Sequence, residues 1–194
     1  MRSIDETKVS THNGKPLRAL AVTLTLRDCP ASSDDWHTIR TNFIKRLRRL
    51  GMVRMHWVTE WQRRGVPHLH GAVWVHADDF TIPSKIIESW CDLVADFGAS
   101  PRAQYILDIT DPVGWFQYMA KHAARGVNHY QRSVKNIPEL WKQKTGRVWG
   151  KVGDWEGVII PAGDVHLSDD SYYKMRRLAR RWRIADARAS VSSY

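Results

Sequence analysis

Two histidines separated by a single residue have the spacing of metal ligands. His68 and His70 lie in the run PHLHGAVWVH, whose valines and aromatic residues predict a strand. Alternate residues of a strand project from the same face, so both imidazoles can reach one metal ion. A histidine pair of this kind also occurs on surfaces and in packed cores, so the metal interpretation needs support from other residues.

A carboxylate on the preceding strand supplies that support. Residues 53–61 also have a strand pattern, and the connecting residues QRRGVP contain turn-forming Gly and Pro, which predicts a β-hairpin. In the register that places Glu60 opposite His68 or His70, the apolar residues share the other face, namely Val53, Met55, Trp57, Trp61, Leu69, Val73 and Val75. A register shifted by one residue would put Glu60 in the core.

The three predicted ligands favour an open metal site. Two imidazoles and one carboxylate leave coordination positions free, which suits Mn²⁺ or Mg²⁺ acting as a Lewis acid on a phosphoryl oxygen. A closed structural zinc site would need a fourth protein ligand. The predicted chemistry is therefore metal-assisted reaction at a phosphate.

A tyrosine on a predicted helix is the candidate nucleophile. Asp111 and Pro112 have the types expected at a helix cap and first turn, and the helix extends to about Arg125. Tyr118, Lys121 and Arg125 recur at spacings of three and four and share one polar face. A tyrosine hydroxyl needs cationic neighbours to react, and Lys121 supplies one. The alternative is an ordinary boundary tyrosine among solvated basic residues.

Composition limits the kind of protein that carries these residues. The 194-residue chain is 43% hydrophobic, which is enough for one domain with a core and excludes a disordered tail protein. Its 30 Lys and Arg against 20 Asp and Glu give a net charge of +10, typical of proteins that bind phosphate backbones. Two unpaired cysteines, no membrane-length apolar run and no signal-peptide core predict a soluble cytoplasmic protein.

The order of elements predicts the fold that positions these residues. A strand at residues 18–27, a helix at 34–50, the hairpin, a helix from Pro83 to Gly98, a strand at 102–109 and the tyrosine helix follow one another. This order is that of a ferredoxin-like, split βαβ antiparallel sheet in an α+β domain. Beyond Gly126 the pattern predicts loops and short strands to residue 163, then a basic helix at 171–187.

Four side chains are candidates for DNA contacts, and one of them is Arg125 on the predicted tyrosine helix. Trp74 shares the strand face of His68 and His70, where a base could stack on its ring. Arg63 and Arg64 lie in the hairpin turn and could hold phosphates. The alternatives are a core tryptophan and a merely solvated turn.

The motifs together resemble the HUH endonuclease superfamily of replication initiators. The resemblance lies in EWQRRGVPHLHGAVW and the downstream YMAK, with LAVTLTLR similar to the first motif of that family and GRVWGKVG similar to runs in bacteriophage and plasmid members. It implies that Glu60, His68 and His70 bind the metal, that Tyr118 is the nucleophile and that Lys121 is its phosphate-side partner. It also implies a 5′-phosphotyrosine intermediate with a free 3′-hydroxyl, formed at a single-stranded or hairpin origin in rolling-circle replication.

The resemblance refines the expected mechanism and partners. Histidines that precede the tyrosine are typical of replication initiators, whereas conjugative relaxases have the reverse order. His122 stands where some relatives carry a second tyrosine, which favours a single nucleophile, and the chain lacks the G-x-x-x-x-G-K-[ST] phosphate loop, so a host helicase is the expected partner. The expected parts are a polar lead at 1–16, a nicking domain at 17–168 and a basic helix and tail at 169–194.

Two alternatives to a replication initiator stay open at this point. A single-tyrosine transposase of the same superfamily would share the metal and the nucleophile, although those relatives typically pair their tyrosine with a downstream Gln, and Lys121 favours replication. A non-catalytic, basic nucleic-acid-binding module would have structural histidines. A covalent adduct with DNA separates the module from both enzymes.

Overall fold

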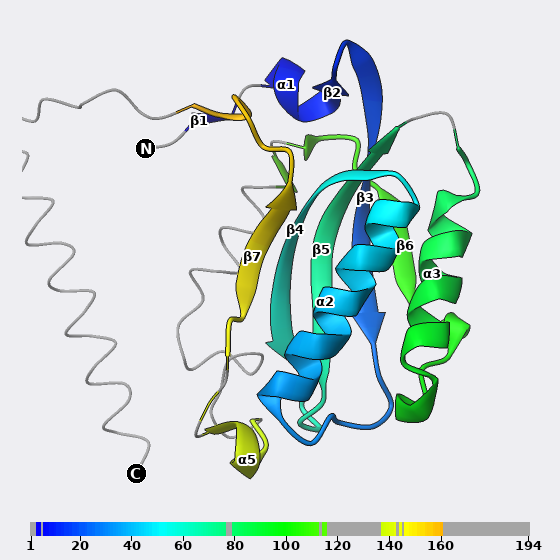
Figure 1. Cartoon of the computed structure of the whole chain (residues 1–194), viewed down its shortest axis with the longest axis vertical. Coiled ribbons are helices and arrows are strands. Elements are labelled where there is room, and N and C mark those ends of the chain that lie inside the picture. Colours follow the sequence, from blue (N-terminus) through cyan, green and yellow to red (C-terminus); the bar gives the residue numbers. More distant parts are fainter. Residues whose placement is uncertain are drawn as a thin grey trace, which may run out of the picture.

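The computed structural model describes residues 3–4, 6–76, 79–112, 114–115, 137–142, 144 and 146–160 (Figure 1). The strands are β1 (Ser3–Ile4), β2 (Thr11–His12), β3 (Lys15–Thr25), β4 (Met52–Trp61), β5 (Pro67–His76), β6 (Tyr105–Asp108), β7 (Trp149–Gly153) and β8 (Ile159–Ile160). The α-helices are α1 (Glu6–Ser10), α2 (Ser33–Arg49), α3 (Ile82–Leu93) and α5 (Glu139–Lys142), with 3₁₀ turns at Ala95–Phe97 and Pro101–Ala103.

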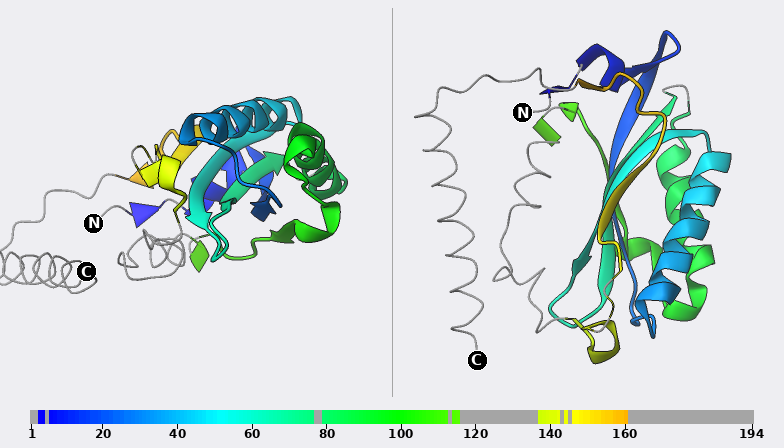
Figure 2. Two further views of the ribbon diagram at one scale, coloured as in Figure 1. Left: turned by 90° about the horizontal axis from the view of Figure 1, so that it is seen from below. Right: turned by 60° about the vertical axis from the view of Figure 1, so that its left-hand side comes forward.

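The main sheet has the topology expected from the order of its elements. Its strands lie in the order β2-β3-β5-β4-β7, and β6 pairs with β3. Strand β5 is antiparallel to both of its neighbours, so β3 and β4 run in the same direction on either side of it. Helix α2 connects β3 to β4, α3 connects β5 to β6, and both helices cover the same face (Figures 1 and 2). The predicted α+β, split βαβ architecture is confirmed.

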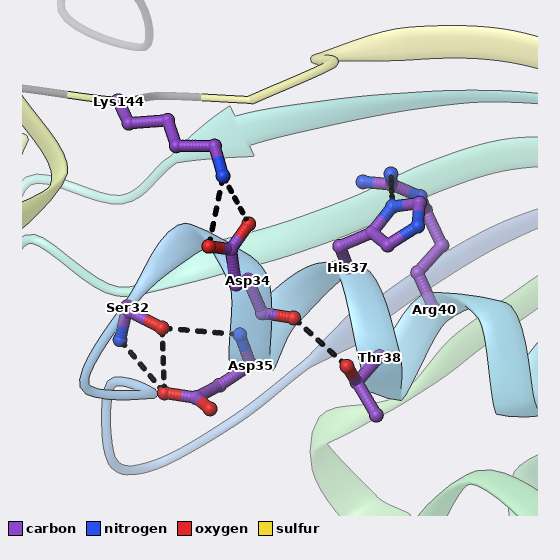
Figure 3. Close-up of polar contacts among 7 residues, drawn as sticks. All are labelled: Ser32, Asp34, Asp35, His37, Thr38, Arg40 and Lys144. Carbon is purple, nitrogen blue, oxygen red and sulfur yellow. Dashed lines mark hydrogen bonds and ion pairs between the residues drawn. The ribbon is translucent and has the colours of Figure 1, made fainter.

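Helix α2 begins at a capping box. The hydroxyl of Ser32 accepts a hydrogen bond from the backbone N–H of Asp35 at 3.1 Å, and the Asp35 carboxylate accepts one from the Ser32 backbone N–H at 3.0 Å (Figure 3). The two bonds satisfy groups that the first helical turn leaves unpaired. Lys144 forms an ion pair with Asp34 at 2.8 Å, so the segment before β7 is attached to the start of the helix.

The core lies between the helices and the sheet. Trp36 and Phe43 of α2 pack edge-on against Trp90 of α3, with ring centroids 6.1 and 5.0 Å apart. The indole N–H of Trp90 donates to the carbonyl oxygen of Thr25 at the end of β3, at 3.1 Å. These contacts fix both helices on the sheet and leave its opposite face to carry the polar residues of β3, β4 and β5.

Two details differ from the sequence prediction. The strand pattern predicts Val53 in the core, but β4 has an irregularity between Met52 and Arg54, and Met52 takes the buried position instead. The polar lead contains β1, α1 and β2, and its Val9 is buried in a second cluster with Ala19, Ala72, Trp74 and Val158.

The outer parts of the chain are described only in part. The predicted helix at 171–187 and residues 116–125 of the tyrosine helix lie outside the described residues. Within the described ranges, no helix has the length and apolar character needed to cross a membrane.

Candidate metal centre

Glu60, His68 and His70 converge on the sheet face opposite α2 and α3, which we call the metal face. The Oε2 atom of Glu60 lies 3.2 Å from Nε2 of His70 and 3.7 Å from Nε2 of His68. The two Nε2 atoms are 3.2 Å apart. Potential ligand atoms of all three residues lie within 4.8 Å of one another. The pairing that the hairpin pattern predicted is present, with Glu60 directly opposite His68.

The spacing of these atoms fits a divalent ion. Adjacent ligands of an octahedral ion with bonds of about 2.1 Å are separated by about 3 Å. Two of the three separations are 3.2 Å and the third is 3.7 Å. The three donor atoms can therefore occupy one face of a coordination octahedron and leave its other three positions to water or substrate.

The surroundings of Glu60 and His68 suit metal binding. The Glu60 side chain is only 3% exposed, and a carboxylate so deeply buried is normally paired with a cation. Burial lowers the pKa of His68 below its ordinary value, against the opposing effect of the hydrogen bond with Glu60. A lowered pKa favours the neutral imidazole, which is the form that binds metals.

Thr23 on β3 orients the His70 ring. Its Oγ1 lies 2.9 Å from Nδ1 of His70, across the paired strands β3 and β5. With the proton on Nδ1 donated to this hydroxyl, Nε2 keeps its lone pair for the ion. The alternation of residues 18–27 predicts that Thr23 faces away from the core. That orientation brings the Thr23 hydroxyl to the His70 ring.

Gly71, between the candidate ligand His70 and Ala72, allows β4 and β5 to approach closely. A Cβ atom at this position would lie 2.7 Å from the carbonyl oxygen of His56 and 3.1 Å from the methyl group of Met55. Both distances are shorter than ordinary contacts, so a side chain would push the two strands apart. The glycine therefore helps to keep Glu60 within reach of the histidines.

Arg64 in the hairpin turn has intramolecular partners. Its guanidinium donates to the carbonyl oxygens of Leu26 and Arg27 and, at 2.7 Å, to the side chain of Gln62. Gln62 in turn donates to the hydroxyl of Thr25 at 2.9 Å. These bonds attach the turn to the end of β3, while Arg63 beside it is exposed. A phosphate contact by either arginine stays a prediction.

Trp74 does not offer a surface for stacking, and that prediction was wrong. Its register on β5 does place it on the metal face, opposite Ala19 and Arg54. However, the side chain is 0% exposed and packs in the second cluster, with its ring 5.4 Å from that of Trp155. The N-terminal segment and the segment after β7 cover this end of the face, so a base cannot reach the ring.

The remaining candidate residues fall in the segment for which the sequence predicts the tyrosine helix. Tyr118, Lys121 and Arg125 lie outside the described residues, so their positions relative to the metal ligands remain predictions. The start of the helix is described: the Asp111 side chain accepts a hydrogen bond from the backbone N–H of Gly114 at 2.8 Å, as expected of a cap.

Two exposed aromatic residues on the metal face were not identified from the sequence. Tyr105 is 59% exposed and Trp149 is 57% exposed. Both belong to one row of directly paired residues across the sheet, formed by Trp149, Val58, His70, Thr23 and Tyr105. Directly paired residues share a face, so the row places an exposed ring on each side of His70. The run GRVWGKVG contains all of β7, including Trp149, but its glycines obscure the alternation that is typical of a strand.

Comparison with known proteins agrees with the type of site. Residues 19–125 match the family of the replication-associated protein ORF2. The chain is 57% identical over 195 residues to a replication-associated protein of Pseudomonas phage Pf3, covering 99% of this chain and 66% of that protein. No solved structure matches the chain.

Two bacterial relatives also match most of this chain. A "Putative replication protein" of Xylella fastidiosa strain Temecula1 is 50% identical over 178 residues, and one of strain 9a5c is 49% identical over 179 residues. The alignments cover 90% of this chain and 67% and 63% of those proteins. The chain thus spans about two thirds of the length of the curated relatives that it matches. On the extent of the family match and these identities, the chain belongs to the family of the replication-associated protein ORF2.

Proposed function

We propose that this protein is a divalent-metal-dependent endonuclease that nicks single-stranded DNA at a replication origin and rejoins the strand, in rolling-circle replication. The observation that carries the proposal is the convergence of Glu60, His68 and His70 on one sheet face, in a chain of a replication-associated family. The net charge of +10 supports a polyanionic substrate.

Mn²⁺ or Mg²⁺ is the proposed ion. When bound, it supplies a Lewis acid for a non-bridging oxygen of the scissile phosphate. The chain contributes the arrangement of donors: Glu60 is held in a buried position opposite His68, and Thr23 fixes the orientation of the His70 ring. Mg²⁺ prefers oxygen ligands, so the two imidazoles favour Mn²⁺ in this pair of ions.

Tyr118 is the proposed nucleophile. Its phenolic oxygen forms a bond with the scissile phosphorus, and the bond from phosphorus to the 3′ oxygen breaks. The phenol loses its proton, and the leaving 3′ oxygen takes one up to become a hydroxyl. One phosphodiester bond is exchanged for another, so the reverse reaction can rejoin a strand without an external energy source. Lys121, one turn along the helix, is proposed to favour the phenolate and to hold the phosphate.

The metal face suggests how the single strand is held. Base stacking on Tyr105 and Trp149 would place nucleotides on both sides of His70, over a row about 19 Å long at the usual strand spacing. Arg63, Arg64 and Arg125 are proposed phosphate contacts. The proposed partners are a single-stranded or hairpin origin and a host helicase that opens the duplex.

The test is a covalent adduct. The protein is incubated with a randomised, end-labelled single-stranded oligonucleotide library and Mn²⁺ or Mg²⁺, and products are separated under denaturing conditions. Wild type and Tyr130→Phe are expected to give an adduct, whereas Tyr118→Phe or excess EDTA is expected to abolish it. Sequencing the adducts gives the cleavage site. DNA mapped to another residue, or full activity in EDTA, contradicts the mechanism, and no adduct under any condition favours a binding module.

A further inference from the structure

A basic groove lies on the helix side of the sheet, between α2, β4 and β7. Its volume is about 240 Å³, and its lining includes five basic side chains: Arg40, Lys45, Arg48, Arg147 and Lys151. The other lining residues are His37, Thr41, Ile44, Trp57 and Val152, so none is acidic. The groove belongs to a different surface from the metal centre, because Trp57 and Ile44 are part of the core under the helices.

Arg40 gives the groove a buried positive charge. Only 3% of Arg40 is exposed, and its guanidinium lies over the ring of Trp57, 3.9 Å from the centroid. Nη2 donates to Nδ1 of His37 at 2.8 Å and Nη1 to the carbonyl oxygen of Arg147 at 3.2 Å. Figure 3 shows Arg40 and His37 meeting on successive turns of α2.

The charge of Arg40 has no compensating carboxylate in the part of the chain that the structure describes. Neither hydrogen-bond partner is anionic, and no described carboxylate lies within ion-pair distance. Burial and the nearby charge of Arg147 lower the pKa of Arg40 to about 10, which still leaves it protonated at neutral pH. A buried, uncompensated cation is unfavourable by itself and becomes favourable when an anion occupies the site.

The remaining cations extend this charge along the surface. Lys45 and Arg48 are exposed on α2, three residues apart and therefore on one side of the helix. Arg147 and Lys151 are exposed on the opposite wall. A linear polyanion can contact both walls at once, whereas a small ion can neutralise only part of the set.

We propose that this groove binds the phosphodiester backbone of DNA, as a second contact separate from the metal face. Arg147 lies between the two surfaces, with its guanidinium carbon 6.0 Å from the ring of Trp57 in the groove and 5.7 Å from the ring of Trp149. Strand β7 is paired only with β4 among the described strands, so a DNA strand crossing the metal face can continue round this edge. The groove then holds DNA beyond the cleavage site.

The experiment measures binding without cleavage. Fluorescence anisotropy of a labelled 30-nucleotide single strand is recorded in EDTA as a function of salt, for the wild-type chain and for the Lys45→Gln/Arg48→Gln variant. Losing two phosphate contacts is expected to lower affinity about 10- to 25-fold at 0.1 M salt and to reduce the log–log salt slope by about 1.4. Circular dichroism is expected to show unchanged folding, since both side chains are exposed.

The control variant removes the same charge elsewhere. Lys15→Gln/Arg49→Gln changes two exposed basic residues that do not line the groove, so it is expected to lower affinity less than about threefold. Equal losses in both variants, or an unchanged salt slope, would overturn the proposal. If inorganic phosphate raises the melting temperature of the wild type but not of the groove variant, while both bind DNA equally, the groove is a small-anion site and the proposal is wrong.

The result is independent of the proposed nicking activity. Binding in EDTA does not require the metal or Tyr118, so failure of the adduct assay leaves this measurement intact. Conversely, the groove variant at saturating DNA is expected to form adduct at the wild-type rate. Loss of that rate at saturation would show that the groove residues act on cleavage rather than on binding, against the proposal.

Discussion

The hydroxyl of Thr23 lies 2.9 Å from Nδ1 of His70, so a residue of β3 determines which nitrogen of a β5 histidine faces the other ligands. Three adjacent strands thus build the candidate centre, although only two of them supply ligands. A hydrogen bond to the far nitrogen of a histidine ring is also what holds metal-binding histidines in orientation, so the contact is consistent with a metal site.

Replacing Thr23 with valine is expected to weaken metal binding. The variant keeps the side-chain shape but removes the hydroxyl that is hydrogen-bonded to Nδ1 of His70, which is expected to lower Mn²⁺ affinity about 10- to 100-fold. Isothermal titration calorimetry measures the change. Thr25→Val is the matched control, because the hydrogen bonds of the Thr25 hydroxyl go to the side chain of Gln62 and the carbonyl oxygen of Leu26 and not to His70. Similar losses in both variants would mean that the Thr23 hydroxyl does not act through His70.

Replacing Glu60 with glutamine is expected to separate metal binding from DNA binding. The amide keeps the size of the side chain but removes the anionic ligand, so Mn²⁺ affinity is expected to fall about 100-fold or more. Single-strand affinity measured in EDTA is expected to change little, because Lys and Arg provide it. Glu88→Gln, on the exposed side of α3, is the control for both measurements. An unchanged Mn²⁺ affinity in Glu60→Gln would place the ion elsewhere.

Replacing Gly71 with alanine is expected to affect both stability and the metal site. The added Cβ would meet the His56 carbonyl oxygen at 2.7 Å, and overpacking of this kind costs about 1 to 3 kcal/mol in the free energy of unfolding. Chemical denaturation and Mn²⁺ titration test the two effects. The control Gly14→Ala strains a turn with φ +73° but has no neighbour within 4 Å, so it is expected to reduce stability alone. Full metal affinity in Gly71→Ala would contradict the role given to the close strand contact.

Replacing Trp149 with alanine tests the proposed path of the single strand. Loss of one stacked base is expected to weaken single-strand binding by about 1 to 3 kcal/mol, with little change in stability because the ring is exposed. Trp74→Phe is expected to do the opposite, lowering stability while preserving DNA affinity, since its ring is buried. Anisotropy and thermal unfolding compare the two variants. If only Trp74→Phe weakens DNA binding, the assignment of these two rings is reversed.

The sequence was sufficient to predict the hairpin and the convergence of its three candidate ligands. Glu60, His68 and His70 could be paired because strand residues alternate in direction and only one register kept the apolar residues together. The same rule placed Thr23 on the correct face. Helices α2 and α3 were predictable for a similar reason, since each has an apolar stripe. The predicted end of the second helix at Gly98 was wrong, because α3 ends at Leu93 and a separate 3₁₀ turn at Ala95–Phe97 precedes that glycine.

Contacts between distant segments were not predictable in the same way. Alternation placed Trp74 on the metal face, but it could not show that Val9 and Val158 cover that position from opposite parts of the chain. Met52 replaces Val53 in the core because a local irregularity changes the alternation. Arg64 donates hydrogen bonds to the Leu26 and Arg27 carbonyls at the end of another strand, and the turn sequence alone could not show these contacts. Each case depends on tertiary neighbours rather than on local pattern.

The second cluster also has a consequence for the order in which the protein folds. Strand β1 pairs with β8, joining Ser3 to Ile160, and Val158 packs with residues near the N-terminus. The core under α2 and α3 uses mainly residues before 95 and can form while synthesis continues. Strand β1, although made first, cannot pair until residue 160 has left the ribosome. Until then Trp74 lacks Val158 and Trp155, two of the residues that cover it, so this end of the metal face is closed last.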